Sequence, residues 1–70
     1  MFIYKVFFFY QEDKALYFEK LLKENNLFFE RGEENSNKGV VYLFGVRKTD
    51  NQKALQLYQY LLTFYLQMLY

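Results

Sequence analysis

The alternation of apolar and polar residues divides the chain into five segments. Residues 2–10 form a nearly continuous aromatic and β-branched run, which is typical of a strand covered on both faces. Apolar positions then recur at helical spacing over 12–26, opposite a charged face. Two further apolar runs of strand length follow at 27–31 and 40–47, and a capped helical pattern covers 50–69. The predicted order is β-α-β-β-α.

Several local signals mark the ends of these segments. Asn26 is expected to take the left-handed position after the first helix. The polar stretch 32–39, bracketed by glycines, predicts a long hairpin loop. Gly45 predicts either a bulge or a close backbone approach. Because a bulge would exchange the side chains that face the two sides of the sheet, the sequence does not determine which side of this strand faces the core. Thr49 and Gln52 have the spacing of a capping box.

This element order predicts an α+β fold of a single domain, residues 1–70. The simplest arrangement is a partial ferredoxin-like, split β-α-β fold, with a three-stranded antiparallel sheet and both helices on one face. The third strand would lie between the first and the second. Because the last strand of the complete ferredoxin-like pattern is missing, the first strand would be an open edge.

Composition restricts the chemistry that the chain can perform. It has 24% aromatic residues and a net charge of +1, and it contains no Cys, His, Pro or Trp. Without Cys and His it has no disulfide, thiol nucleophile or histidine base, so we expect a non-enzymatic protein without cofactors. Ser36 is interpreted as a turn residue, since no base accompanies it. The balanced charge gives no electrostatic signature of nucleic-acid binding.

Self-association is the prediction that the apolar residues favour. A 70-residue chain can bury only a small core, and aromatic residues on the open sheet face and the C-terminal helix would stay exposed. We therefore expect a homo-oligomer, with the two-fold dimer as the commonest form. In the alternative, the C-terminal segment bends back over the open face. The candidate interface residues are Lys5, Phe7, Phe9, Tyr42, Phe44, Phe64, Leu66 and Leu69.

Basic residues near the start of the second helix suggest a small anionic ligand. Arg47 and Lys48 directly precede Thr49, and a helix N-terminus attracts anions. Arg31, at the end of the second predicted strand, and Lys53 could join them. The competing interpretation is that these basic residues are ordinary solvated ends of strands.

Two segments carry a family resemblance: "EDKALYFEKLLKENNLFFERGEE" (12–34) and "VRKTDNQKALQLYQYLL" (46–62). The pattern resembles short bacterial signal-transducing proteins with a PII-like, ferredoxin-like fold. That resemblance implies a regulatory or binding role, commonly exercised through oligomers, and no catalytic residues. Two alternative functions remain: the chain could be a structural subunit for another protein, or it could bind single-stranded RNA on an aromatic sheet face.

The uncharged stretch from Ala54 to Tyr70 reaches only the lower length limit of a membrane span. Gln56, Gln59 and Thr63 recur along it at helical spacing, which makes spanning costly. No basic segment with a cleavage site follows Met1, so a cytoplasmic location is the expectation.

Overall fold

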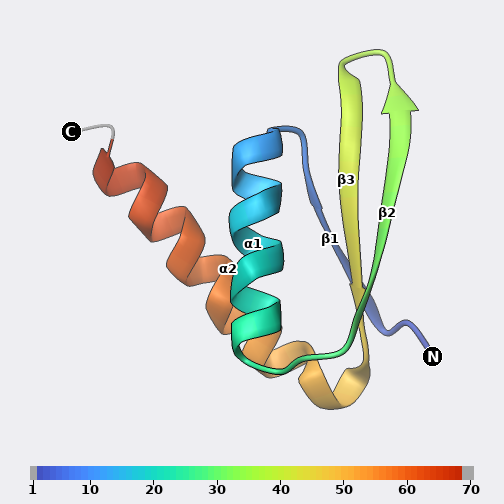
Figure 1. Cartoon of the computed structure of the whole chain (residues 1–70), viewed down its shortest axis with the longest axis vertical. Helices are drawn as coiled ribbons and strands as arrows, with labels where there is room; N and C mark the ends of the chain where they lie inside the picture. The colour runs from blue at the N-terminus through green and yellow to red at the C-terminus, as the bar shows by residue number, and fades with distance from the viewer. Residues whose placement is uncertain (1, 69–70) are drawn as a thin grey trace.

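A computed structural model describes residues 2–68 of the chain, with side chains through residue 65. Its elements are β1 (Lys5–Phe9), α1 (Glu12–Glu24), β2 (Phe29–Ser36), β3 (Gly39–Val46) and α2 (Lys48–Met68). The strands form one antiparallel sheet in the order β1-β3-β2. Both helices lie on the same side of that sheet (Figure 1). The predicted α+β fold with the order β-α-β-β-α is therefore confirmed.

The core lies between the sheet and the two helices, and it is built largely from aromatic rings. Phe18 of α1 is fully buried, and its ring centroid lies 5.3 Å from that of Phe7, 5.1 Å from that of Phe9 and 5.5 Å from that of Phe44. Tilted and edge-on ring pairs at these distances add attraction beyond simple burial. The remaining buried apolar residues are Ala15, Leu22, Tyr42, Val46, Ala54, Leu57 and Leu61.

The face of the sheet on which each side chain lies corrects the expectation that four aromatic residues form an oligomer interface. Phe7 pairs with Phe44, Phe9 pairs with Tyr42, and all four side chains face the helices and are buried. They therefore cannot lie on the open sheet face, and their expected role in an oligomer interface was wrong. The reason is volume: large rings fill the space between the sheet and α1, since protein interiors are close-packed.

The first helix ends as its sequence predicts. Asn26 has a φ of +57°, the left-handed conformation that Asn tolerates better than most residues. The Leu27 N–H donates to the Leu22 carbonyl at 3.0 Å, and the Asn26 N–H donates to the Lys23 carbonyl at 3.1 Å. These two bonds define a Schellman motif, which satisfies carbonyls that the end of a helix leaves free. The turn directs the chain from α1 into β2.

The connection between β2 and β3 is much shorter than expected. The polar residues through Ser36 belong to β2 and pair in continuous register with β3, so the turn itself holds only Asn37 and Lys38. Gly39 follows with a φ of +108°, and the Ser36 hydroxyl donates to its carbonyl at 2.8 Å. A strand at a sheet edge is largely solvated, so polar composition does not exclude strand structure there.

Gly45 marks a close approach rather than a bulge. The pairing of β3 with both neighbours runs through Gly45 without an extra residue. On the open face, a Cβ at this position would come within 2.8 Å of the Ile3 Cδ1 atom and 3.0 Å of its Cγ2 atom. The segment before β1 therefore packs its Ile3 side chain into the space that the missing Cβ leaves.

The second helix begins earlier than its predicted cap. Lys48 is its first residue, so Thr49 lies inside the first turn and the predicted capping box is wrong. Instead, the Arg47 side chain donates two hydrogen bonds to the Asp50 carboxylate across that turn. The 21 residues of α2 span about 31 Å, against about 17 Å for the five residues of β1. The C-terminal half of α2 consequently extends away from the sheet (Figure 1).

Candidate functional site

One candidate site is a hollow at the start of α2. Its lining consists of Phe2, Phe28, Arg47, Lys48 and Thr49, and its volume is about 420 Å³. Phe2 comes from the segment before β1, Phe28 from the turn after α1, and the three polar residues from the β3–α2 junction. Three separate parts of the chain thus bring two exposed aromatic rings and two cations to one opening.

The two cations of this hollow differ in their surroundings. The Arg47 guanidinium lies 4.4 Å from the centre of the Phe28 ring, within cation–π range, and its Nε and Nη2 atoms donate to Asp50 Oδ2 at 3.1 and 2.9 Å. Much of its bonding capacity is therefore used within the chain. Lys48 is exposed, and its Nζ atom lies 6.0 Å from the Tyr4 ring, at the outer limit of such an interaction. Lys48 is the better placed of the two for an external anion.

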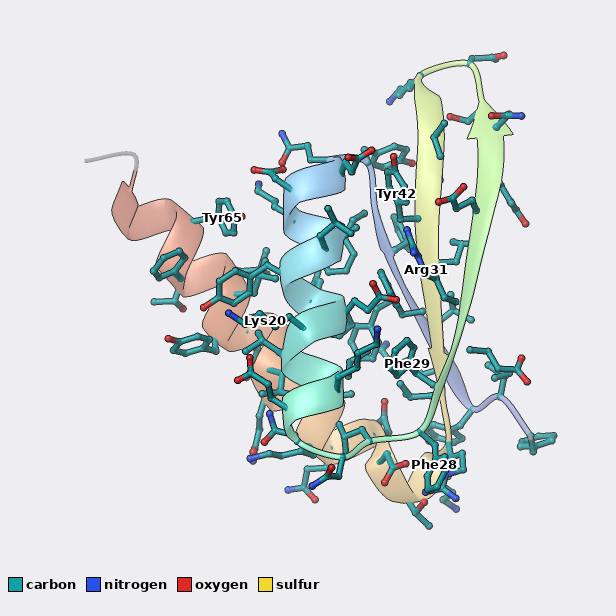
Figure 2. The ribbon with its side chains drawn as sticks, in the orientation of Figure 1. Lys20, Phe28, Phe29, Arg31, Tyr42 and Tyr65 are labelled. Atoms are coloured by element: carbon teal, nitrogen blue, oxygen red, sulfur yellow. The ribbon has the colours of Figure 1, made fainter. Side chains whose placement is uncertain are left out.

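Arg31 does not belong to this hollow. It lies on β2 opposite Phe44, and its guanidinium forms ion pairs with Glu19 of α1 at 3.8 Å and with Glu33 at 3.2 Å. Figure 2 shows Phe28 beside the start of α2, and Arg31 further along the sheet beside α1. The structure therefore brings Arg47, Lys48 and Thr49 together and places Arg31 elsewhere.

A second candidate site is a groove along the free edge of β1, between that strand and α2. Its smaller part has a volume of about 150 Å³ and is lined by residues 5–8 of β1 together with Leu55 and Tyr58 of α2. Its continuation, of about 330 Å³, runs past Phe8 and Tyr10 to Leu62. The groove thus has apolar side chains on its strand side and on its helix side, with Lys5 at one end and Gln11 and Lys14 at the other.

The remaining predicted interface residues do not form one surface in the described part of the chain. Lys5 is exposed at the start of β1, and its Nζ atom lies 5.5 Å from the Phe7 ring. Phe64 packs within the chain, stacked on Tyr17 with 5.6 Å between ring centroids. The Leu66 side chain and residue Leu69 lie outside the described part of the chain.

The residues that sequence reasoning missed are mostly exposed aromatics. The sequence pattern places Phe2 and Phe28 only within strands, and Phe8 in a strand covered on both faces. A signal existed for Phe8: it alternates with Phe7 and Phe9, so once the core side is known, period-two alternation places it on the opposite face. Phe28 had no such signal, because it precedes β2 in an irregular turn.

Tyr42 and Tyr65, which lie outside these sites, have altered acidity. The Tyr42 hydroxyl donates to Glu12 Oε2 at 3.0 Å, and this bond, together with burial, raises the pKa of Tyr42 above its usual range. Burial, followed by the nearby Asp13 carboxylate, raises the pKa of Tyr65. Both tyrosines hold their protons more firmly than exposed ones, and they anchor the start of α1 to β3 and to α2.

Comparisons of the chain with family models, with curated proteins and with solved structures find no match. Across residues 2–68, the structure contains no helix long and apolar enough to cross a membrane. Within the same residues, no three acidic side chains gather closely enough to hold a metal ion. The functional argument therefore rests on the two surfaces described above.

Proposed function

We propose that this chain is a non-enzymatic binding or regulatory module that acts as a homo-oligomer. The observation that carries the proposal is the band of exposed apolar side chains on both sides of the β1 edge: Val6, Phe8, Tyr10, Leu55 and Leu62. Contiguous apolar surface of this kind is uncommon on soluble monomers and usually marks an interaction site. The resemblance to PII-like signalling proteins agrees with such a role.

The accessible surface of the single chain supports this proposal. The chain exposes 5185 Å², whereas about 4,700 Å² is expected for a folded monomer of 8.7 kDa. An unpaired sheet edge and a helix that extends beyond the sheet both add exposed surface. Association of two copies at the β1 edge would cover part of it.

Sedimentation equilibrium from micromolar to near-millimolar concentration tests the proposal. We expect the average mass to rise with concentration towards twice the chain mass of 8.7 kDa. A mass that stays at one chain throughout this range would contradict self-association. A mass that continues to grow without limit would indicate open aggregation at the strand edge instead of a closed oligomer.

A second candidate function is binding of a small planar anion in the hollow at the start of α2. The observation that favours it is the pairing of the exposed Phe2 and Phe28 rings with Lys48, Thr49 and the first turn of a 21-residue helix. The first N–H groups of a helix lack partners within the helix and attract anions. Exposed aromatic rings at the opening suit a ligand that is itself flat, such as a nucleotide or an aromatic carboxylate.

Thermal unfolding with adenosine monophosphate, benzoate or inorganic phosphate tests this second function. A ligand at ten times its Kd should stabilise the fold by about 1.4 kcal/mol, which raises Tm by about 5 °C or more. Lys48→Gln should abolish the shift, whereas Lys20→Gln on α1 should preserve it, because Lys20 pairs with Glu24 away from the hollow. No shift with any of the three probes would refute the anion site.

The alternative of single-stranded RNA binding receives less support. Phe7, Tyr42 and Phe44, which would have formed its stacking platform, are buried beneath the helices. The open face retains Phe8, but β2 contributes the acidic residues Glu30 and Glu34 to it. Carboxylates repel the phosphate backbone that dominates the affinity of such complexes.

A further inference from the structure

The two outer edges of the sheet differ sharply in character. From residue 30 to 36, β2 carries the side chains of Glu30, Arg31, Glu33, Glu34 and two small polar residues. β1 carries a single charge, that of Lys5, followed by four apolar residues. Charged side chains on an edge strand prevent pairing with other chains, and natural proteins use them for that purpose. The β2 edge is protected in this way and the β1 edge is not.

The groove beside β1 provides what an additional strand would need. An incoming strand bonds to the free N–H and C=O groups of the edge and must also cover its side chains on both faces. On the helix side, Leu55, Tyr58 and Leu62 of α2 border the groove. On the open side, Phe8 and Tyr10 meet edge to face, with 6.0 Å between ring centroids. Both faces of an added strand would therefore contact apolar surface.

We infer that two copies of this chain associate by antiparallel pairing of β1 with the β1 strand of the second copy, which joins the two sheets into one of six strands. This inference rests on the proposed self-association and specifies its geometry. A two-fold axis perpendicular to the sheet keeps the helices of both copies on the same face. The α2 residues that border the groove then approach their counterparts across the axis.

The distribution of charge favours an antiparallel arrangement. Parallel pairing would place Lys5 beside its counterpart, and like charges directly opposite each other are destabilising. In antiparallel pairing, each Lys5 lies near the C-terminal end of the partner strand. That end leads into Glu12 and Asp13, the acidic first turn of α1. The two Lys5 side chains are thus kept apart, and the end of the groove that each one approaches carries Lys14 as well as the two carboxylates.

The surface available at the edge approaches the area that a modest dimer buries. Phe8 and Tyr10 are each 55% exposed, so together they present about 200 Å². Val6, Leu55, Leu62 and the backbone edge of five residues extend the footprint towards the roughly 600 Å² per partner at which small specific interfaces begin. Concentration-dependent, reversible association is the expected behaviour of an interface of this size.

Stacking of the two open sheet faces is the rival geometry, and the side chains there suit it less well. Next to Phe8 on this face lies Leu43, which is half-buried beside Ile3 and Gly32. Glu30 and Glu34 occupy the β2 portion of the same face. Stacking would bury these carboxylates, and burying a charge without a partner is costly.

Three lysine substitutions distinguish the two geometries by sedimentation equilibrium. Phe8 and Leu62 lie on opposite sides of the β1 edge, whereas Leu43 lies on the open face of the central strand β3, one strand in from that edge. We expect the first two variants to weaken the dimer at least tenfold, and Leu43→Lys to leave it within threefold of the unmodified chain. Circular dichroism and thermal unfolding check that each variant is folded, and Val6→Lys replaces Phe8→Lys if that variant is not.

The failures of the inference and of the proposed function are distinguishable. A dimer that Leu43→Lys dissociates and Leu62→Lys leaves intact would overturn edge pairing while preserving self-association. A dimer unaffected by both Phe8→Lys and Leu62→Lys would overturn edge pairing as well. If the unmodified chain is monomeric at every concentration, both proposals fail. The same holds if its β1 edge pairs only with an extended peptide from another protein.

Discussion

Replacement of Gly45 by Ala tests how the segment before β1 closes over the sheet. The new Cβ would lie 2.8 Å from Ile3 Cδ1, closer than real contacts allow, and 3.0 Å from Ile3 Cγ2, which is a very tight contact. Ile3 must therefore move away from β3. Gly32→Ala is the matched control: it lies on β2, and its Cβ would meet only Leu43 at 3.9 Å, an ordinary contact.

The magnitude follows from two opposing effects. Gly→Ala at a site that tolerates Ala stabilises a protein by about 0.4–1 kcal/mol, because the unfolded chain loses freedom. We expect this gain for Gly32→Ala. For Gly45→Ala the same gain is offset by the displacement of the half-buried Ile3, at a cost of about 1–1.5 kcal/mol. The two variants should therefore differ by about 1–1.5 kcal/mol, or roughly 5–10 °C in Tm for a chain of this size.

Urea unfolding and thermal unfolding of both variants measure this difference. Introducing Gly45→Ala into a chain that already carries Ile3→Ala completes a double-mutant cycle. With the Ile3 side chain removed, Gly45→Ala should stabilise the chain about as much as Gly32→Ala does. If Gly45→Ala stabilises the unmodified chain as strongly as Gly32→Ala, the packing of Ile3 over Gly45 is refuted.

Three further predictions concern the core and its boundaries. Asn26→Ala should cost about 1 kcal/mol in urea unfolding and Asn26→Gly should not, because the residue has a φ of +57°. Tyr42→Phe removes the bond to Glu12 and should cost about 1 kcal/mol at pH 7. The pKa of Tyr42 is raised in the folded chain, so the stability that Tyr42 contributes is present below pH 10 and is lost as the pH rises further. Tyr42→Phe should therefore lose less stability than the unmodified chain as the pH rises above 10. Phe18→Ala should cost about 3–5 kcal/mol, most of the stability expected for 70 residues, whereas Leu16→Ala on the exposed side of α1 should change stability by less than about 0.5 kcal/mol.

Local sequence signals predicted the parts of the fold that local interactions determine. Helix α1 and its end at Asn26 depend on side-chain spacing and on one left-handed residue, and both are visible in the sequence. The extent of β2 is different, because residues Gly32–Ser36 become a strand only through pairing with β3. The same composition without that partner is typical of a loop.

Side-chain parity was the feature that the sequence could not determine. β3 has apolar residues on both sides, so periodicity alone does not distinguish Tyr42 and Phe44 from Val41 and Leu43. The contact between Phe44 and Phe18 of α1 decides it, and that contact is tertiary. Interface residues predicted from the wrong side of the strands therefore proved to be core residues.

The candidate site was predicted only where its residues are adjacent in sequence. Arg47, Lys48 and Thr49 are consecutive and necessarily lie together. Phe2 and Phe28 reach the same hollow from distant parts of the chain, so only the fold reveals them. Arg31 was expected there because it was placed at a strand end, but β2 continues past it and its side chain meets Glu19 of α1.

Amide hydrogen exchange of β1 tests edge pairing most directly. In a single chain, alternate N–H groups of an outer strand point away from the sheet and exchange rapidly, on β1 as on β2. If β1 pairs with a second copy, all N–H groups from Lys5 to Phe9 should be protected at high concentration, and the outward-pointing ones should lose protection on dilution, while those of β2 exchange rapidly throughout. Equal, rapid exchange of alternate amides on both strands at every concentration would contradict the account.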